Sequence, residues 1–141
     1  MKETQLITEI GDLIAHYKEH GNKSTINDLL DMRDQIACNC WNLAEYTGDS
    51  KMSYNEVYFK RKIEIARQKQ AMFDRNEPNT KADVRAIIAS EGLFNAEILK
   101  EGTAFKLDLL LKAANKIIDA ISQRISYMKI EESQSHFQNQ T

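Results

Sequence analysis

Residues 107–129, LDLLLKAANKIIDAISQRISYMK, carry apolar side chains at alternating steps of four and three residues. A second apolar line, at residues 110, 113, 117, 120 and 127, lies beside the first. This spacing predicts an α-helix whose apolar face is wider than one isolated helix can hide. We therefore expect the face to pack against helices of the same chain, of further copies, or of both. The side chains expected to contribute to assembly are Leu107, Leu111, Ile118, Ile121, Ile125 and Met128.

The composition extends the helical prediction to the whole chain. Of the 141 residues only one is Pro and five are Gly, so residues that break helices are scarce. We expect an all-α helical bundle with a long C-terminal helix, in a single domain over residues 1–132 that forms homo-oligomers. The expected helical regions are 4–47, 53–75 and 80–132, and residues 133–141, SQSHFQNQT, are expected to form a flexible tail because they lack periodicity.

Short polar stretches mark the expected helix ends. Thr25 and Thr80 each have an acidic residue three positions on, which is the spacing of a capping box. The stretch TGDS at residues 47–50 is expected to end the second helix. Pro78 predicts a loop over residues 76–79, because a proline disfavours helical geometry at the residue before it. Two glycines, at positions 92 and 102, leave open whether the last helix is continuous.

The apolar residues of the middle helices are expected in the core. Trp41 lies on the apolar side of the second helix, where a large aromatic is ordinarily a core anchor. In the region 53–75, Phe59, Ile63, Ala66 and Phe73 form one line at helical spacing. This line is expected to face inward, which leaves the neighbouring tyrosines at positions 54 and 58 exposed.

Positive charge is concentrated at residues 58–75, YFKRKIEIARQKQAMFDR, with six Lys or Arg against two acidic residues. The formal charge of the whole chain is only −2, so the rest of the chain is acidic. Cations beside exposed aromatics are the combination that binds single-stranded nucleic acid without reading its sequence. The expected nucleic-acid-binding residues are Tyr58, Lys60, Arg61, Lys62, Arg67, Lys69 and Arg75. A solvated helix face is the alternative interpretation of the same charges.

No familiar catalytic motif occurs in the chain. The glycine-rich phosphate loops, the H-E-x-x-H metalloprotease motif and the G-x-S-x-G nucleophile motif are all absent. His16 and His20 share a helix face but lack the further ligands of a zinc site. Glu91, Glu97 and Glu101 could form a carboxylate cluster, although such spacing is more typical of a solvated flank. The sequence therefore predicts no enzyme, no metal and no cofactor.

The expected compartment follows from the thiols and from hydropathy. Cys38 and Cys40 are two residues apart on a helix, so their side chains diverge and a disulfide between them is not expected. Free thiols suit a reducing compartment. The chain has no apolar run of membrane-spanning length and no apolar signal-peptide core at its start. A cytoplasmic protein with no membrane partner is expected.

The sequence resembles the phage recombination mediators of the UvsY type. The resemblance lies in the chain length, the basic helix with aromatic neighbours, the short loop after it, and a long final helix that contains the run IIDAISQR at residues 117–124. That family has two basic residues around a spacer, shortly before an aromatic pair and a loop. The matching residues here are Arg67, Gln68 and Lys69, followed by Met72 and Phe73, so one aromatic of the pair is replaced by methionine.

The resemblance implies a phage-encoded, ring-forming, non-enzymatic protein in the host cytoplasm. Such a protein binds single-stranded DNA and helps a recombinase displace the single-strand-binding protein. The implied partners are therefore single-stranded DNA, a recombinase, the single-strand-binding protein and further copies of the chain. An alternative is an oligomeric phage structural or interaction protein, an assembly factor or an inhibitor of a host protein, whose basic helix contacts an acidic partner. Strand binding distinguishes the two, and the chemistry of cations and stacking does not separate DNA from RNA.

Overall fold

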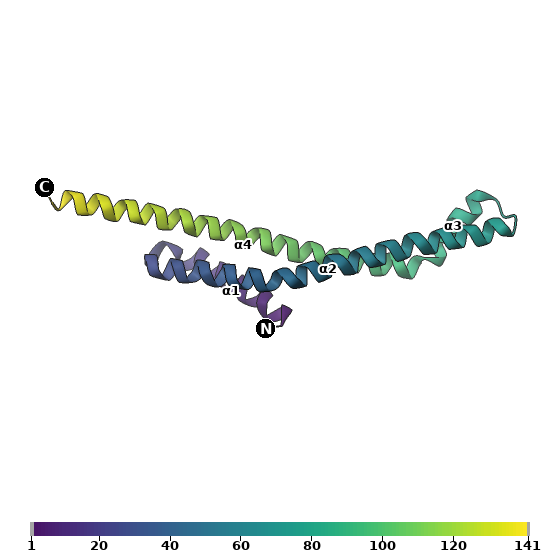
Figure 1. The fold of residues 1–141 in the computed structure, drawn as a ribbon, viewed down its shortest axis with the longest axis horizontal. Coiled ribbons are helices and arrows are strands. Elements are labelled where there is room, and N and C mark those ends of the chain that lie inside the picture. Colours follow the sequence, from purple (N-terminus) through teal and green to yellow (C-terminus); the bar gives the residue numbers. More distant parts are fainter. Residues whose placement is uncertain (1, 141) are drawn as a thin grey trace. The chain divides into compact units, whose positions relative to one another are not determined.

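The computed structural model describes residues 2–140 and is built from helices joined by short turns (Figure 1). The helices are α1 (Glu3–His20), α2 (Ile26–Asp74), α3 (Asn79–Ala89) and α4 (Glu91–Gln138), with a 3-10 turn, η1 (Gly21–Lys23), between the first two. The described residues contain no strand. The predicted all-α fold with a long C-terminal helix is thus confirmed.

The contacts of the chain fall into two compact units. Unit 1 consists of Met1–Tyr46 with Asp108–Thr141, and unit 2 consists of Thr47–Leu107. Helices α2 and α4 each contribute one segment to each unit. The sequence had suggested one domain over residues 1–132.

Unit 1 has a core of aliphatic side chains from three helical segments. Hydrogen bonds on its surface connect Asn39 to Glu9 at 3.2 Å and the Arg124 guanidinium to the Asn22 carbonyl at 3.2 Å. The buried apolar residues are Leu6, Ile10, Leu29, Met32, Ile36, Leu43, Ala114, Ile121 and Ile125. Their spacing in α2 and α4 is the three-and-four repeat that the sequence showed, so this core follows the predicted pattern.

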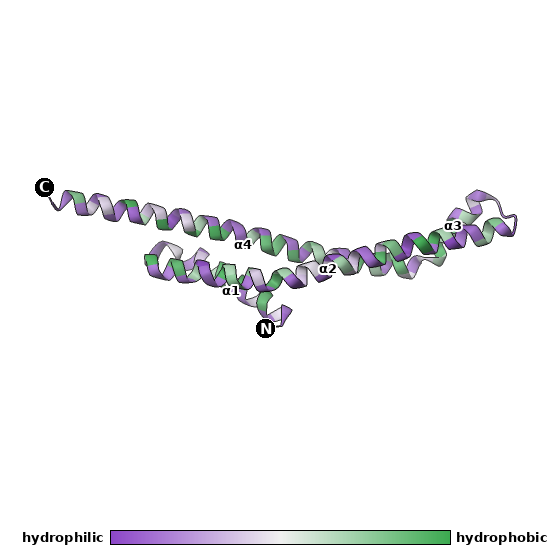
Figure 2. Ribbon diagram, in the orientation of Figure 1, coloured by the Kyte–Doolittle hydropathy of each residue, from purple (hydrophilic) through white to green (hydrophobic). Residues whose placement is uncertain are grey.

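Unit 2 has a different interior. Its buried apolar side chains are Met72, Ala82, Ala86 and Leu107, of which two are alanines. Three polar residues are buried with them, namely Thr47, Ser90 and Glu97. Figure 2 shows apolar residues recurring along α2 and α4, yet in unit 2 the large ones are mostly outside. Burial of apolar area therefore stabilises unit 2 less than unit 1.

Two expected helix ends are confirmed. The Thr25 hydroxyl accepts a hydrogen bond from the Asp28 amide at 3.2 Å, and the Asp28 carboxylate accepts one from the Thr25 amide at 3.3 Å, which forms the predicted capping box. At the other end of α2, Asn76 has φ of 59°. The Glu77 amide bonds to the Met72 carbonyl at 3.1 Å, so an asparagine in the left-handed conformation closes the helix.

Three expected boundaries are wrong. The stretch TGDS does not end a helix, because α2 continues through Gly48 to Asp74. Thr80 does not cap α3, which begins at Asn79 after Pro78. The tail is helical to Gln138. At TGDS and in the tail the sequence lacks a proline or a left-handed glycine that would stop the helix, and continuing an existing helix gains a hydrogen bond per residue. At α3 the helix begins one residue earlier than expected, directly after Pro78.

The junction between α3 and α4 is a single residue, Ser90. Its amide donates to the Ala86 and Ile87 carbonyls at 3.2 and 3.1 Å, and its carbonyl accepts from the Leu93 and Phe94 amides at 3.0 and 3.1 Å. The Ser90 hydroxyl is buried and has no partner within the described residues. Gly102 lies inside α4, which is continuous from Glu91.

Because Gly48 lies in a helix interior with a negative φ and open space around its Cα, alanine at this position should stabilise the protein. We expect Gly48→Ala to raise the free energy of unfolding by about 0.5–1 kcal/mol, measured by urea denaturation with circular dichroism. Gly21→Ala is the matched control. Its added Cβ would lie 2.7 Å from the Tyr17 ring, so this variant is not expected to gain stability. A loss of stability in Gly48→Ala would mean that α2 is interrupted there.

Candidate nucleic-acid interface

The outer face of α2 in unit 2 carries an apolar stripe. We call Met52, Phe59, Ile63, Ala66 and Phe73 the α2 stripe. Phe59, Ile63 and Phe73 are 59%, 52% and 63% exposed, so the prediction that this line forms the core is wrong. The opposite face of the helix, with Met72 buried and Arg61 half-buried, lies inward instead.

The contacts of Arg61 show how a basic residue of α2 can lie in the interior of unit 2. Its guanidinium makes two hydrogen bonds with the Glu97 carboxylate of α4, one from Nε to Oε2 and one from Nη2 to Oε1 at 3.2 Å. The guanidinium carbon lies 4.5 Å from the centre of the Phe94 ring and 5.3 Å from that of Tyr58. The side chains of Arg61 and Glu97 are only 17% and 12% exposed. This bidentate pair between two rings is a structural contact of unit 2.

Tyr58 is also turned partly inward. The Lys62 ammonium lies 4.6 Å from the centre of its ring, and the Phe59 ring meets it edge-on at 5.5 Å. Tyr54 is half-buried as well, and partial burial and the nearby Glu101 and Glu97 carboxylates raise its pKa. The sequence predicted exposed tyrosines and a buried Phe59, whereas the structure has Phe59 exposed and both tyrosines half-buried.

The remaining predicted cations lie on the surface. Lys60 and Arg67 are seven residues apart along one edge of the α2 stripe, and Lys62 and Lys69 are seven apart along the other. Lys69 forms an ion pair with Asp83 of α3 at 3.0 Å. Lys60, Arg67 and the exposed Arg75 have no acidic partner among residues 2–140. Of the seven predicted binding residues, the structure brings four together as two basic rows around exposed aromatics.

The residues expected to drive assembly are largely used within the chain. Leu107 is buried in unit 2, while Ile121 and Ile125 are buried in unit 1. Leu111, Ile118 and Met128 are half-buried. A wide helical stripe can be filled by the chain's own helices, and the pattern alone does not say which helices fill it. Assembly through these residues stays a prediction.

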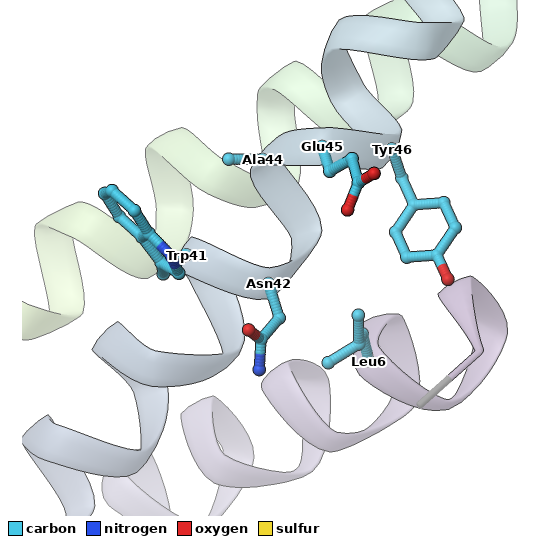
Figure 3. Close-up of a pocket in the computed structure, with 6 residues that line it drawn as sticks. All are labelled: Leu6, Trp41, Asn42, Ala44, Glu45 and Tyr46. Atoms are coloured by element: carbon cyan, nitrogen blue, oxygen red, sulfur yellow. The ribbon is translucent and has the colours of Figure 1, made fainter.

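Trp41 is 80% exposed, so its prediction as a core anchor is wrong. It borders an open hollow of about 560 Å³ in unit 1, lined also by Leu6, Asn42, Ala44, Glu45 and Tyr46. In Figure 3, Leu6 of α1 and Asn42 of α2 point toward each other, whereas Trp41 points away from α1. The polar groups of the lining are the Asn42 amide, the Glu45 carboxylate and the Tyr46 hydroxyl.

The structure also accounts for the two other groups of residues considered as sites, the histidine pair and the glutamate cluster. The His16 and His20 rings contact each other with centroids 4.8 Å apart and planes tilted by 47°. No group of three or more His, Cys, Asp or Glu side chains in the described part of the chain could hold a metal ion. In the proposed carboxylate cluster, Glu97 is already bound to Arg61. Cys38 is exposed and Cys40 half-buried, and both are free thiols as predicted.

Comparisons with protein family models, with curated proteins and with solved structures find no match for this chain. Within residues 2–140, no helix has a stretch long and apolar enough to cross a membrane.

Substitutions of Arg61 and Arg67 provide a matched test of the buried Arg61–Glu97 pair. Arg61→Met leaves Glu97 buried without its partner, and we expect it to lower the free energy of unfolding by about 3 kcal/mol. Arg67→Met removes an exposed cation and should change the free energy of unfolding by less than about 0.5 kcal/mol. Urea denaturation of both variants provides the measurement. Equal effects would show that Arg61 is not held in the interior of unit 2.

Burial raises the pKa of the Cys40 thiol above its usual value, so less of this thiol is the reactive thiolate at neutral pH. Cys38 is exposed, and we expect iodoacetamide at pH 7.5 to label it several-fold faster than Cys40. Mass spectrometry of the labelled peptides gives the two rates, with Cys38→Ser and Cys40→Ser variants to assign them. Equal rates would contradict the described burial.

Proposed function

We propose that the protein is a non-enzymatic single-stranded DNA-binding protein whose binding surface is the outer face of α2 in unit 2. The observation that carries this proposal is the pair of basic rows, Lys60 with Arg67 and Lys62 with Lys69, on the two edges of a face that exposes Phe59 and Phe73. Cations at these edges can neutralise phosphates, while exposed rings can stack on bases of any identity.

The geometry of the rows suits a backbone contact better than base recognition. Residues seven apart on a helix are separated by about 10 Å along its axis. Among residues 2–140, Lys60, Lys62 and Arg67 have no acidic partner, whereas Lys69 is paired with Asp83. Such side chains follow phosphates and carry no sequence information. Arg61 and Tyr58, which the sequence had placed in this site, are left out because they lie in the interior contacts of unit 2.

On the biological role, we propose that the protein acts as a recombination mediator. Its sequence resemblance to the UvsY type supports this role, which would load a recombinase onto DNA that is coated by single-strand-binding protein. Such a task needs a protein that holds the strand without cutting or modifying it. The two free thiols are in keeping with a reducing compartment such as the cytoplasm.

The first experiment is fluorescence anisotropy of a labelled oligo-dT strand, titrated with protein at several salt concentrations. About four phosphate contacts per chain predict that log K falls with log salt at a slope of about −3. We expect Lys60→Ala, Lys62→Ala, Arg67→Ala together to lower the affinity at least tenfold and to flatten the slope.

The matched control removes the same charge elsewhere. Lys18, Lys23 and Lys129 are exposed in unit 1, and changing all three to alanine should leave most of the affinity. If both triple variants lose affinity equally, only the net charge matters and α2 is not the binding surface. If the wild type does not bind at low salt, the proposal is wrong and the alternative, contact with an acidic protein partner, is favoured.

A further inference from the structure

A groove lies between α3 and the C-terminal part of α2 in unit 2, beside the basic row that contains Lys69. Its volume is about 360 Å³, which is within the range of small-molecule sites. Four residues of α2 between positions 66 and 73 and three residues of α3 between positions 79 and 83 line it. On each helix these residues are three or four positions apart, so each helix presents one face to the groove.

The apolar part of the lining suits a flat ring. Phe73 borders the groove and is 63% exposed. The other apolar residues of the lining are Ala66 and Ala82, whose small side chains leave room beside the Phe73 ring. A nucleobase gains binding energy when it stacks on an exposed aromatic side chain. The groove therefore offers a space in which one base can stack on Phe73.

The polar part of the lining carries one positive and one negative charge. The Lys69 ammonium and the Asp83 carboxylate form the ion pair described above, and their side chains are 48% and 56% exposed. Gln70 and Asn79 contribute neutral amides. A carboxylate repels a phosphate, so the inside of the groove does not suit the backbone of a strand. It suits a neutral group that donates hydrogen bonds to the Asp83 carboxylate.

Among the nucleobases, guanine has the matching hydrogen-bond donors. Its Watson–Crick edge carries two adjacent donors, N1–H and the N2 amino group, next to the O6 acceptor. A carboxylate can accept from both donors at once. Adenine, cytosine and thymine each have a single donor group on this edge. The Asn79 amide is available to donate to O6, whereas the Gln70 amide already donates to Asp74 at 3.0 Å.

We infer that the groove binds one guanine base of the strand, which stacks on Phe73 and donates hydrogen bonds from N1–H and the N2 amino group to Asp83. The inference rests on the proposed function and adds a base preference to it. The Lys69 ammonium has three donors, so it can keep Asp83 as a partner and also donate to the phosphate beside the base. Backbone contacts along the rows position the strand, and the groove selects guanine at one position.

Strands of equal charge that differ in one base test the inference. Fluorescence anisotropy compares a labelled oligo-dT strand with strands that carry a central dG, deoxyinosine or 7-deaza-dG. We expect the dG strand to bind about fivefold more tightly than oligo-dT, because a bidentate contact discriminates between bases. Deoxyinosine lacks the N2 amino group and should lose most of this preference. 7-Deaza-dG has an unchanged Watson–Crick edge and should keep it.

Asp83→Asn separates base recognition from charge. The variant has one acceptor oxygen in place of two and removes the ionic partner of Lys69. We therefore expect it to lose the guanine preference and still to bind oligo-dT at least as tightly as the wild type. The matched control is Glu56→Gln, which removes an exposed carboxylate on the other edge of the α2 stripe and should keep the preference. A guanine preference that persists in Asp83→Asn overturns the inference.

A measurement with mononucleotides distinguishes failure of the groove from failure of strand binding. In ¹H–¹⁵N NMR spectra, we expect dGMP to shift the backbone amide signals of Phe73, Asn79 and Asp83 more than dTMP does. Strand binding without a guanine preference overturns only the inference about the groove. Shifts specific to dGMP without strand binding overturn only the proposed function. If neither the shifts nor strand binding are observed, both are overturned.

Discussion

The Arg61–Glu97 pair decides which side of α2 faces the interior of unit 2. Both sides of this helix segment carry apolar residues, so the hydrophobic effect alone does not fix its rotation. A carboxylate on α4 and the rings of Phe94 and Tyr58 satisfy the Arg61 guanidinium in the interior. Once Arg61 is inside, Phe59 and Ile63 must be outside, because the helix places them on the opposite side. The exposed stripe and its basic edges both depend on this contact.

An interior held by a charged pair has an energetic consequence. A buried pair contributes less net stability than well-packed aliphatic side chains, because removing two charges from water is costly. Unit 1, with its aliphatic core, does not have this disadvantage. Unit 2 places its large apolar side chains where a partner can reach them. A partner that covered them would raise its stability.

Much of the fold could be predicted from the sequence. The apolar repeat at residues 107–129 and the scarcity of Pro and Gly identify the all-α class. The Thr25 capping box and the loop at Pro78 are local signals that act through a few neighbouring atoms. The break expected at residues 47–50 was wrong because one glycine only weakens a helix. Its effect depends on the packing around it, which a local pattern does not contain.

The candidate site was predicted only in part, again because local patterns do not contain contacts between residues that are distant in the sequence. The four cations of the two rows were identified correctly as surface residues, since charge predicts exposure. Arg61 was misplaced because its partner, Glu97, is 36 residues away in the sequence. The exposure of Trp41 was missed as well, since an apolar residue at helical spacing can face either a core or a partner chain.

The junction at Ser90 bears on how the protein opens locally. Its amide and carbonyl both remain in helical hydrogen bonds, so α3 passes into α4 through a bend with few unpaired backbone groups. In a hydrogen–deuterium exchange experiment, the amides of Ser90, Leu93 and Phe94 should be protected like those of a helix interior. Although Ser90 lies between two helices, the backbone amides of the junction would thus exchange together with those of α3 and α4, as part of one cooperative segment.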